Sequence, residues 1–316
     1  MNSPARCNFG NDSLKNHGLI GWLKGYAWMT AAVVIWASWL VLTSSGVTTD
    51  LSPIDLAGLR ALVPAIVLGP LLWRQRQEIA KLGLARCLML SLYGAPFTLC
   101  VGYGLGYAPV AHAGAMVPSL MPVIVAFAGS LIFGQRISQP HLWSALLIVS
   151  GALAIVLRSD EISGTRDIWI GHALFLMAAL FWACFTLTLR RHAVPPFLAT
   201  SVVATISTLG LVPIWALPGL SSLGSASTSD VVFQLIFQGV ITGLVSLYAY
   251  GQALQLIGLV ATRLAAMTPA VATLLAVPVL AQVPDTFELA VLGLVVGGLL
   301  VASLPPRVTL TPAVQR

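Results

Sequence analysis

Ten stretches of the sequence are long and apolar enough to cross a bilayer as helices. Each holds about 18–24 residues, the length a helix needs to cross the ~30 Å hydrocarbon layer. Their apolar residues are continuous rather than alternating, which predicts helices and not strands. Only 8% of residues are charged and 58% are hydrophobic, so a soluble core cannot hide them. We therefore predict an all-α integral membrane protein with spans at 25–45, 54–73, 85–107, 110–133, 140–157, 168–189, 196–217, 231–254, 259–281 and 287–304.

The distribution of Lys and Arg predicts the orientation of these spans. With the N-terminus inside, twelve of the sixteen basic residues lie on the cytoplasmic side, and only Arg158 and Arg166 lie opposite; Arg60 and Arg263 lie within spans. Such an excess is typical of cytoplasmic segments. We expect the protein in the inner (plasma) membrane of the cell. An even number of spans then places both termini in the cytoplasm. The net charge of +6 thus orients the chain in lipid and predicts no nucleic-acid partner.

The two ends of the chain are polar and short. Residues 1–23 lack the apolar core and small-residue cleavage site of a signal peptide, so we interpret them as a disordered cytoplasmic tail, and residues 305–316 as a second one. The sequence has four cysteines, Cys7, Cys87, Cys100 and Cys184, and their spacing is not that of metal ligands. We therefore predict that they pack against apolar neighbours and that the protein has no metal site.

The second half of the chain resembles the first. A shift of 147 positions places Tyr103-Gly104 on Tyr250-Gly251, Pro122 on Pro269, Gln135 on Gln282 and Gly151 on Gly298. Ten of the 55 positions between 103–157 and 250–304 are identical. A shift of 146 further upstream places Trp36 on Trp182.

Two repeats of five spans each follow, at residues 24–158 and 168–304. Five is an odd number, so the second repeat enters the membrane with inverted orientation. Inverted repeats supply two nearly equivalent conformations, one open to each side of the membrane. This arrangement favours a carrier that works by alternating access over a channel, a scaffold or an enzyme.

Several segments resemble the EamA branch of the drug/metabolite transporter superfamily over about residues 25–304. They are Trp36 in the first span, SPIDLAGLR ending at Arg60, A-x-A-G-A-M-V-P-S-L-M-P-V in the fourth span, Trp182 with Arg190-Arg191, and TRLAAMTPAVATLLAVPVL in the ninth span. The resemblance implies ten spans in a 5+5 arrangement, a cavity lined by spans one, three, four, six, eight and nine, and export of amino acids, related metabolites or drugs.

One departure from the family pattern concerns charge. Family members usually carry a Gly-Glu pair at the ends of spans four and nine, whereas this chain reads Gly134-Gln135 and Ala281-Gln282. No acidic residue falls mid-span anywhere in the sequence. The sequence therefore offers no mid-span carboxylate that could bind a coupling proton or sodium ion. Two modes of transport stay open: proton coupling through other groups, and facilitated transport without a coupling ion.

Polar side chains recur every four residues along span eight. Such spacing places them on one helical face over most of the bilayer depth. A polar group in hydrocarbon costs free energy unless it is paired or faces water. The stripe predicts either a water-lined pathway or hydrogen bonds between packed helices. Its members are Gln234, Gln238, Thr242, Ser246 and Tyr250.

Five aromatic residues are candidates to line the cavity. Tyr103 and Tyr250 are repeat partners, so two phenols are expected to face one another across the pseudo-symmetry axis. Trp36, Trp39 and Trp182 lie mid-span rather than at the headgroups. The alternative interpretations are an interfacial aromatic belt for the tyrosines and core packing for the tryptophans.

Arg60 and Arg263 lie inside the hydrocarbon edge of spans two and nine. An arginine there either reaches the headgroups with its long side chain or pairs with an anion. We expect the two to attract an anionic or zwitterionic solute, Arg60 towards the outer face and Arg263 towards the inner face.

His112 and His172 open spans four and six, and either can titrate near neutral pH and serve proton coupling. We include His112 among the expected cavity residues. Pro122 and Pro269 match across the repeat and are predicted hinges, because a proline removes a helical hydrogen bond.

The sequence contains neither a metalloprotease motif nor a P-loop nor a persuasive nucleophile pair, so we predict no enzyme and no cofactor. The expected partners are a small-molecule substrate and the lipid bilayer, and a homodimer stays open. Two alternatives stay open: an importer of a small organic anion, and a membrane scaffold that moves no solute.

Overall fold

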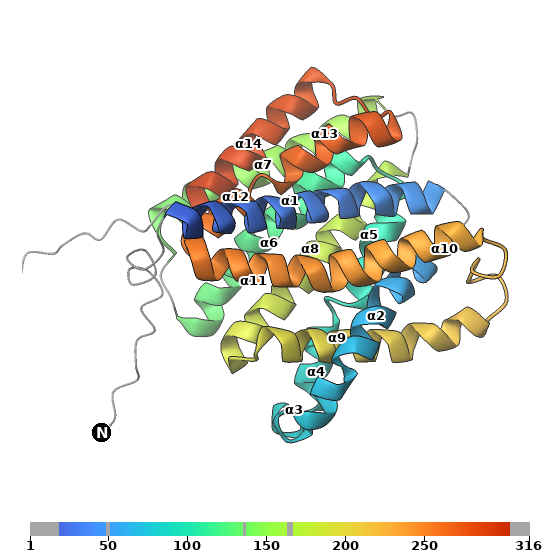
Figure 1. Cartoon of the computed structure of the whole chain (residues 1–316). Helices are drawn as coiled ribbons and strands as arrows, with labels where there is room; N and C mark the ends of the chain where they lie inside the picture. Colours follow the sequence, from blue (N-terminus) through green and yellow to red (C-terminus); the bar gives the residue numbers. More distant parts are fainter. Residues whose placement is uncertain (1–18, 49–50, 135–136, 163–166, 304–316) are drawn as a thin grey trace, which may run out of the picture.

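The computed structural model describes residues 19–48, 51–134, 137–162 and 167–303, and all of its regular elements are helices. They run side by side as one bundle, with α1 between the α13–α14 pair and α11 (Figure 1). The elements are α1 (Leu19–Thr48), α2 (Pro53–Arg74), α3 (Arg76–Leu82), α4 (Leu84–Ser91), α5 (Ala95–Leu105), α6 (Val110–Phe133), α7 (Gln139–Ile162), α8 (Ile168–His192), α9 (Pro196–Leu211), η1 (Val212–Ala216), α10 (Thr228–Gln234), η2 (Leu235–Val245), α11 (Ser246–Ile257), α12 (Leu259–Ala265), α13 (Thr268–Leu280) and α14 (Thr286–Ala302).

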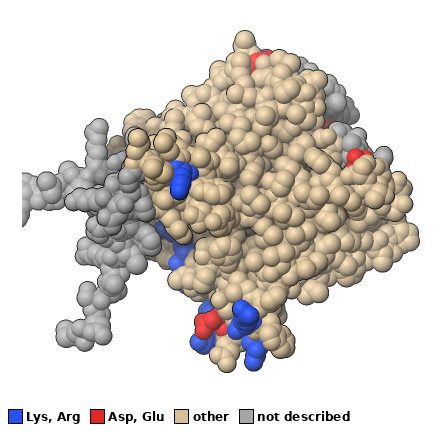
Figure 2. Space-filling model, viewed as in Figure 1, with Lys and Arg blue, Asp and Glu red and all other residues tan. Residues whose placement is uncertain are grey.

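Nine helical stretches in the described part of the chain are long and apolar enough to cross a membrane. The tenth predicted span is the apolar helix α14, whose 17 residues rise about 26 Å at 1.5 Å each. Large apolar side chains are exposed along these helices, and the face seen in Figure 2 carries few charged side chains: a group around α3 and isolated ones elsewhere, mostly towards its edges. The prediction of an all-helical, multi-pass membrane protein is confirmed.

Two predicted spans are broken rather than continuous. The helix expected over 85–107 stops at α4 and restarts as α5, where the Ser207 hydroxyl of α9 accepts a hydrogen bond from the Ala95 N–H at 2.9 Å. The helix expected over 259–281 breaks between α12 and α13, just before Pro269. A proline lacks the N–H that would continue the ladder, so the helix restarts at this residue.

The packing of the helices is nearly symmetric between the two halves. Helix α1 packs against α11 and α13, whereas α8 packs against α5 and α6. Exchanging the halves exchanges these two sets. Helix α2 packs against α9, and α7 against α14, and each of these pairs is its own symmetry partner.

The contact between α7 and α14 shows this symmetry at single residues. A Cβ on Gly151 would lie 3.0 Å from Val295, and a Cβ on Gly298 would lie 2.8 Å from Ile148. A shift of 147 positions turns each pair into the other. Small residues let the two helix backbones approach closely, which stabilises helix pairs in lipid. The shift of 147 positions that aligns the two halves of the sequence therefore also relates their contacts in the structure.

We expect Gly298→Leu to destabilise the bundle and Gly297→Leu to leave it unchanged. A Cβ at Gly298 meets Ile148, while a Cβ at Gly297 meets nothing within 4 Å. Overpacking of this kind costs about 1–3 kcal/mol. Thermal unfolding of the two purified variants in detergent measures the difference. Equal melting temperatures would contradict the α7–α14 contact described above.

Candidate substrate cavity

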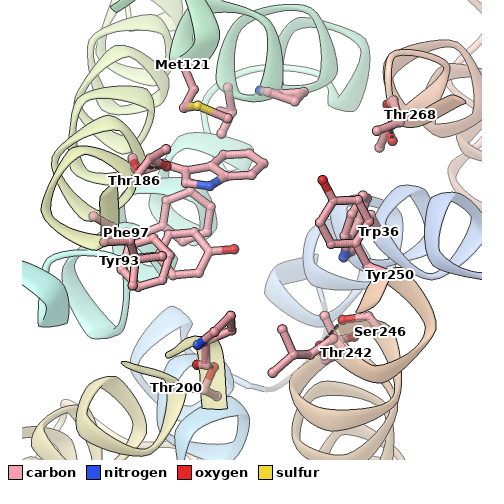
Figure 3. A pocket seen from close by; sticks show the side chains of 18 of the residues that line it. Trp36, Tyr93, Phe97, Met121, Thr186, Thr200, Thr242, Ser246, Tyr250 and Thr268 are labelled. Atoms are coloured by element: carbon pink, nitrogen blue, oxygen red, sulfur yellow. Dashed lines mark hydrogen bonds between the residues drawn. The ribbon is translucent and has the colours of Figure 1, made fainter. Parts of the chain in front are cut away.

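A cavity of about 1080 Å³ lies between the two halves of the bundle. Helices α1, α2, α5 and α6 contribute to its wall from the first half, and α8, α9, α11 and η2 from the second. Figure 3 shows Tyr93 and Phe97 on one side of the open space and Trp36 and Tyr250 on the other. The volume is in the range of sites that hold small organic molecules.

The cavity reaches only one end of the bundle. Its wall includes Arg190 in the last turn of α8, Pro196 in the first turn of α9, and Ser303 just after α14. These positions share one end of the bundle because the helices alternate in direction, and we name it the open end. The starts of α6, α8 and α14 contribute no residue to the wall, and they form the closed end.

Most of the residues predicted to line a cavity do so. Seven of the predicted cavity residues and one predicted hinge lie in its wall: Trp36, Trp39, Arg60, Trp182, Thr242, Ser246, Tyr250 and Pro122. Four others lie elsewhere in the structure: Tyr103, His112, Gln238 and Arg263. Pro269 lies in the first turn of α13, where a proline breaks no hydrogen bond, so the structure does not make it a mid-helix kink.

Arg60 is the charged group that lies deepest in the cavity wall, whereas Arg190 lies at the open end. Its guanidinium carbon lies 4.5 Å above the centre of the Trp39 ring, and the Tyr93 side chain lies next to it. Its Nη1 atom is buried and has no hydrogen-bond partner in the described part of the chain. The nearest acid in sequence, Asp55, is occupied by Ser52, Ser221 and the Ser222 N–H. A buried cation with a free donor is suited to hold an anionic group.

Tyr93 is a cavity residue that the sequence analysis missed. Its ring lies 4.8 Å from the ring of Phe97, 5.7 Å from that of Trp182 and 4.6 Å from that of Phe185, measured between centroids. Across the cavity, the Trp36 and Tyr250 rings are 5.2 Å apart. The sequence did contain one indication that Tyr93 lines the cavity: it is nearer than Tyr103 to the middle of the predicted span 85–107.

Tyr103 does not face Tyr250, contrary to our expectation. Its side chain is 41% exposed and lies outside the cavity wall, on the short helix α5 near its end at Leu105. The break between α4 and α5 is absent from the matching region of the second half, where η2 runs directly into α11. The two tyrosines therefore occupy different depths despite their aligned positions.

The polar stripe of span eight divides into two parts. Gln238 is fully buried: its Oε1 accepts from the Trp39 indole at 2.9 Å, and its Nε2 donates to Thr43 at 3.2 Å. This part joins α1 to η2 and fills the space beyond the cavity. Thr242 and Ser246 face the cavity instead, so both interpretations of the stripe hold, each for its own segment.

Arg263 lies on the short helix α12, outside the cavity wall. Its Nε donates to the Ser303 carbonyl oxygen at 3.2 Å, directly after the end of α14. The last carbonyls of a helix lack intrahelical partners and favour a cation nearby. The structure therefore gives Arg263 a capping role between α12 and α14.

His112 is buried at the closed end rather than exposed to the cavity. Its ring nitrogens contact His172 of α8 and Glu288 of α14. Glu288 lies in the first turn of α14, at the end of a predicted span. Its contact with His112 could not be predicted from the sequence, because the fold alone places the two side chains together.

Three comparisons with known proteins bear on this architecture. Residues 23–157 match the model of the EamA-like transporter family. Those residues are similar to an EamA-like transporter unit. The matched range nearly coincides with the first predicted repeat, 24–158, and the resemblance of this chain to the EamA branch of the drug/metabolite transporter superfamily is confirmed.

A protein of Escherichia coli (strain K12) described as a probable amino-acid metabolite efflux pump is 25% identical over 185 residues. That alignment spans 58% of this chain and 58% of the relative's own length. A crystal structure 21% identical to this chain superposes with a TM-score of 0.56, covering 91% of this chain and 98% of the other. At this identity the superposition supports the fold alone.

The sequence analysis singled out two glutamines, Gln135 and Gln282, at positions where the family pattern has glutamate. Gln135 lies outside the described residues. The Gln282 Oε1 accepts a hydrogen bond from the Val110 N–H at 3.0 Å, which ties the end of α13 to the start of α6 at the closed end. An uncharged amide satisfies this buried donor without placing a charge there.

Proposed function

We propose that the protein is a secondary carrier that exports amino acids, related metabolites or drugs by alternating access. The observation that carries the proposal is the cavity between the two halves, with a buried, incompletely paired arginine among aromatic rings. A cavity shared by two similar halves is the arrangement in which exchanging their conformations moves the access from one end to the other.

The wall chemistry supports a solute class. The free donor of Arg60 fits a carboxylate, and the aromatic groups around Tyr93 and Tyr250 fit an apolar body. Hydroxyl groups of Thr242 and Ser246 lie in the same wall, where they can accept a hydrogen bond from an ammonium group. We infer an amphipathic, carboxylate-bearing solute such as an aromatic or large apolar amino acid.

The proposed orientation follows from charge. We propose ten spans in two inverted repeats, 24–158 and 168–304, with both termini in the cytoplasm of a cell whose inner membrane holds the protein. The open end carries Arg190 and Arg191, which the positive-inside tendency places in the cytoplasm. The cavity then opens to the cytoplasm, the side from which an exporter takes up its solute, and Pro122 in α6 is the proposed hinge.

The proposal is tested by reconstitution into proteoliposomes with three labelled probes. Phenylalanine carries both charges, phenethylamine lacks the carboxylate, and 3-phenylpropionate lacks the amine. We expect saturable movement of phenylalanine, and far less of phenethylamine. Preference for 3-phenylpropionate would favour the alternative of an organic-anion carrier. Movement of no probe above the level of protein-free liposomes would contradict this substrate class and leave the scaffold interpretation in its place.

A further inference from the structure

Three titratable side chains form a chain of hydrogen bonds at the closed end. His112 Nδ1 lies 3.0 Å from His172 Nε2, and His112 Nε2 lies 3.2 Å from Glu288 Oε1. The residues come from α6, α8 and α14, so the chain of bonds joins both halves of the bundle. His112 is 8% exposed and His172 is 4% exposed. The cavity wall contains none of the three.

The hydrogen bonds assign the tautomers when both histidines are neutral and Glu288 is ionised. A carboxylate only accepts, so His112 carries its proton on Nε2. Its Nδ1 is then an acceptor, and His172 must donate from Nε2. This leaves His172 Nδ1 as a bare lone pair. That atom is buried and has no hydrogen-bond partner in the described part of the chain.

One added proton fits this arrangement without breaking a bond. The proton binds the lone pair of His172 Nδ1, and the Nε2 proton of His172 passes to His112 Nδ1. His172 is then neutral and accepts at Nε2, while His112 is an imidazolium that donates to His172 and to Glu288. The net charge of the three side chains rises from −1 to 0. A second proton would place two N–H groups against each other and disrupt the pair.

Other charged groups near the three side chains stay fixed over the range in which histidines titrate. Arg158 of α7 forms an ion pair with Asp285 at 3.0 Å, directly before α14. The pKa of Asp285 is held below its ordinary value, first by the backbone hydrogen bond from Glu288 and then by Arg158. Asp285 therefore stays ionised over the range in which histidines titrate. Asp167, at the start of α8, is exposed to solvent.

The helix ends around these three side chains are closely packed. A Cβ on Gly171 would lie 2.8 Å from Ala108, in the turn before α6. Gln282 bonds the start of α6 to the end of α13. Separation of α8 or α14 from α6 must therefore break the His172–His112–Glu288 bonds. Protonation makes the His112–Glu288 bond one between an imidazolium and a carboxylate, in which both groups are charged, so a proton strengthens the closed arrangement.

We propose that His172, His112 and Glu288 form a proton-binding site that holds the closed end shut when it is occupied. The proton is the ligand, His172 Nδ1 is its point of entry, and the His112 imidazolium paired with Glu288 is the occupied state. In the orientation proposed above, the site faces the outside, so external acid slows the step that opens the cavity outwards. Its effect on transport rests on the proposed function; its effect on the helix ends does not.

The transport test is phenylalanine exchange in proteoliposomes of uniform orientation, with the internal pH fixed at 7.5 and the external pH varied from 8 to 5.5. We expect the wild-type rate to fall about five- to tenfold towards acid, with the slope of a single proton. His172→Gln is expected to flatten this profile. Its matched control is His192→Gln, at the other end of the same helix, which is expected to keep the wild-type profile. A wild-type profile retained by His172→Gln would overturn the site.

A second measurement needs no transport. Backbone hydrogen exchange at residues 110–114 and 168–172, corrected for the intrinsic pH dependence of exchange, is compared at pH 5.5 and pH 8. We expect stronger protection at pH 5.5 in the wild type and no difference in Glu288→Gln, which keeps an acceptor oxygen but loses the charge. Protection independent of pH in the wild type would overturn the site. Protection that responds to pH in a protein that moves no phenylalanine would overturn the proposed function alone.

Discussion

Arg60→Ala is expected to reduce the apparent affinity for phenylalanine by about 10- to 100-fold. A hydrogen bond to a charged group contributes roughly 1.5–3 kcal/mol, and each 1.4 kcal/mol is about a factor of ten. The free Nη1 donor of Arg60 is the one we assign to the solute carboxylate. Concentration-dependent uptake into proteoliposomes measures the change. The loss should be much smaller for phenethylamine, which has no carboxylate to lose.

Two further variants control this result. Arg60→Lys keeps the charge but not the planar fork, so a partial loss is expected. Arg263→Gln removes the other intramembrane arginine, which is not part of the cavity wall and whose Nε donates to the Ser303 carbonyl, and the affinity should stay within about twofold of the wild type. An Arg263 variant that lost affinity as Arg60→Ala does would show that the solute carboxylate is not held by Arg60 alone.

Gly251→Trp is expected to abolish transport while leaving the protein folded. Gly251 lies in the cavity wall next to Tyr250, and a Cβ there meets nothing within 4 Å. The new ring therefore enters the cavity rather than the packed core. Uptake should fall to the level of protein-free liposomes, and the thermal unfolding midpoint should change little.

The matched control is Gly293→Trp. Its Cβ also meets nothing within 4 Å, but Gly293 lies on α14 outside the cavity wall. This variant is expected to transport at the wild-type rate. Full transport by Gly251→Trp would mean that the solute does not pass through this cavity.

Much of the fold could be predicted from the sequence, because a chain that crosses the hydrocarbon layer can adopt few backbone structures. Span length, charge bias and the shift of 147 positions are local or periodic features. They predicted the helices and most cavity residues, such as Arg60 and Tyr250. The shift also aligns Gly151 with Gly298, and only the structure shows that their packing partners exchange in the same way. Mid-span polar and aromatic residues face protein or water because lipid does not satisfy them.

The remaining features depend on contacts between distant segments. Whether Gln238 lines a cavity or bonds Trp39 is decided by a partner 199 positions away. Glu288 meets His112 across 176 positions, and nothing in the local sequence of either residue marks the other. The break before α5 coincides with Pro96, and Ser207 of α9 accepts the Ala95 N–H there from 112 positions away. Tyr103 lies outside the cavity wall and Tyr93 lies within it.

The two halves depart from symmetry within the cavity. Trp36 pairs with Tyr250, and strict symmetry would pair Trp182 with Tyr103; Trp182 packs near Tyr93 instead. The first half supplies Arg60 beside Trp39, whereas Arg190 of the second half lies at the open end. A cavity whose two walls differ in this way holds an amphipathic solute in a single orientation, which two identical walls would not achieve.

The most direct measurement is the reactivity of a thiol at Gly251→Cys, in a chain whose four native cysteines are replaced by alanine. Sealed vesicles of uniform orientation are treated with a membrane-impermeant maleimide from one side at a time. We expect labelling from the open, cytoplasmic end, slowed by phenylalanine, and labelling from the other side only in the fraction of molecules that have switched. Rapid labelling from both sides at once, or reactivity that phenylalanine leaves unchanged, would contradict a solute cavity with alternating access.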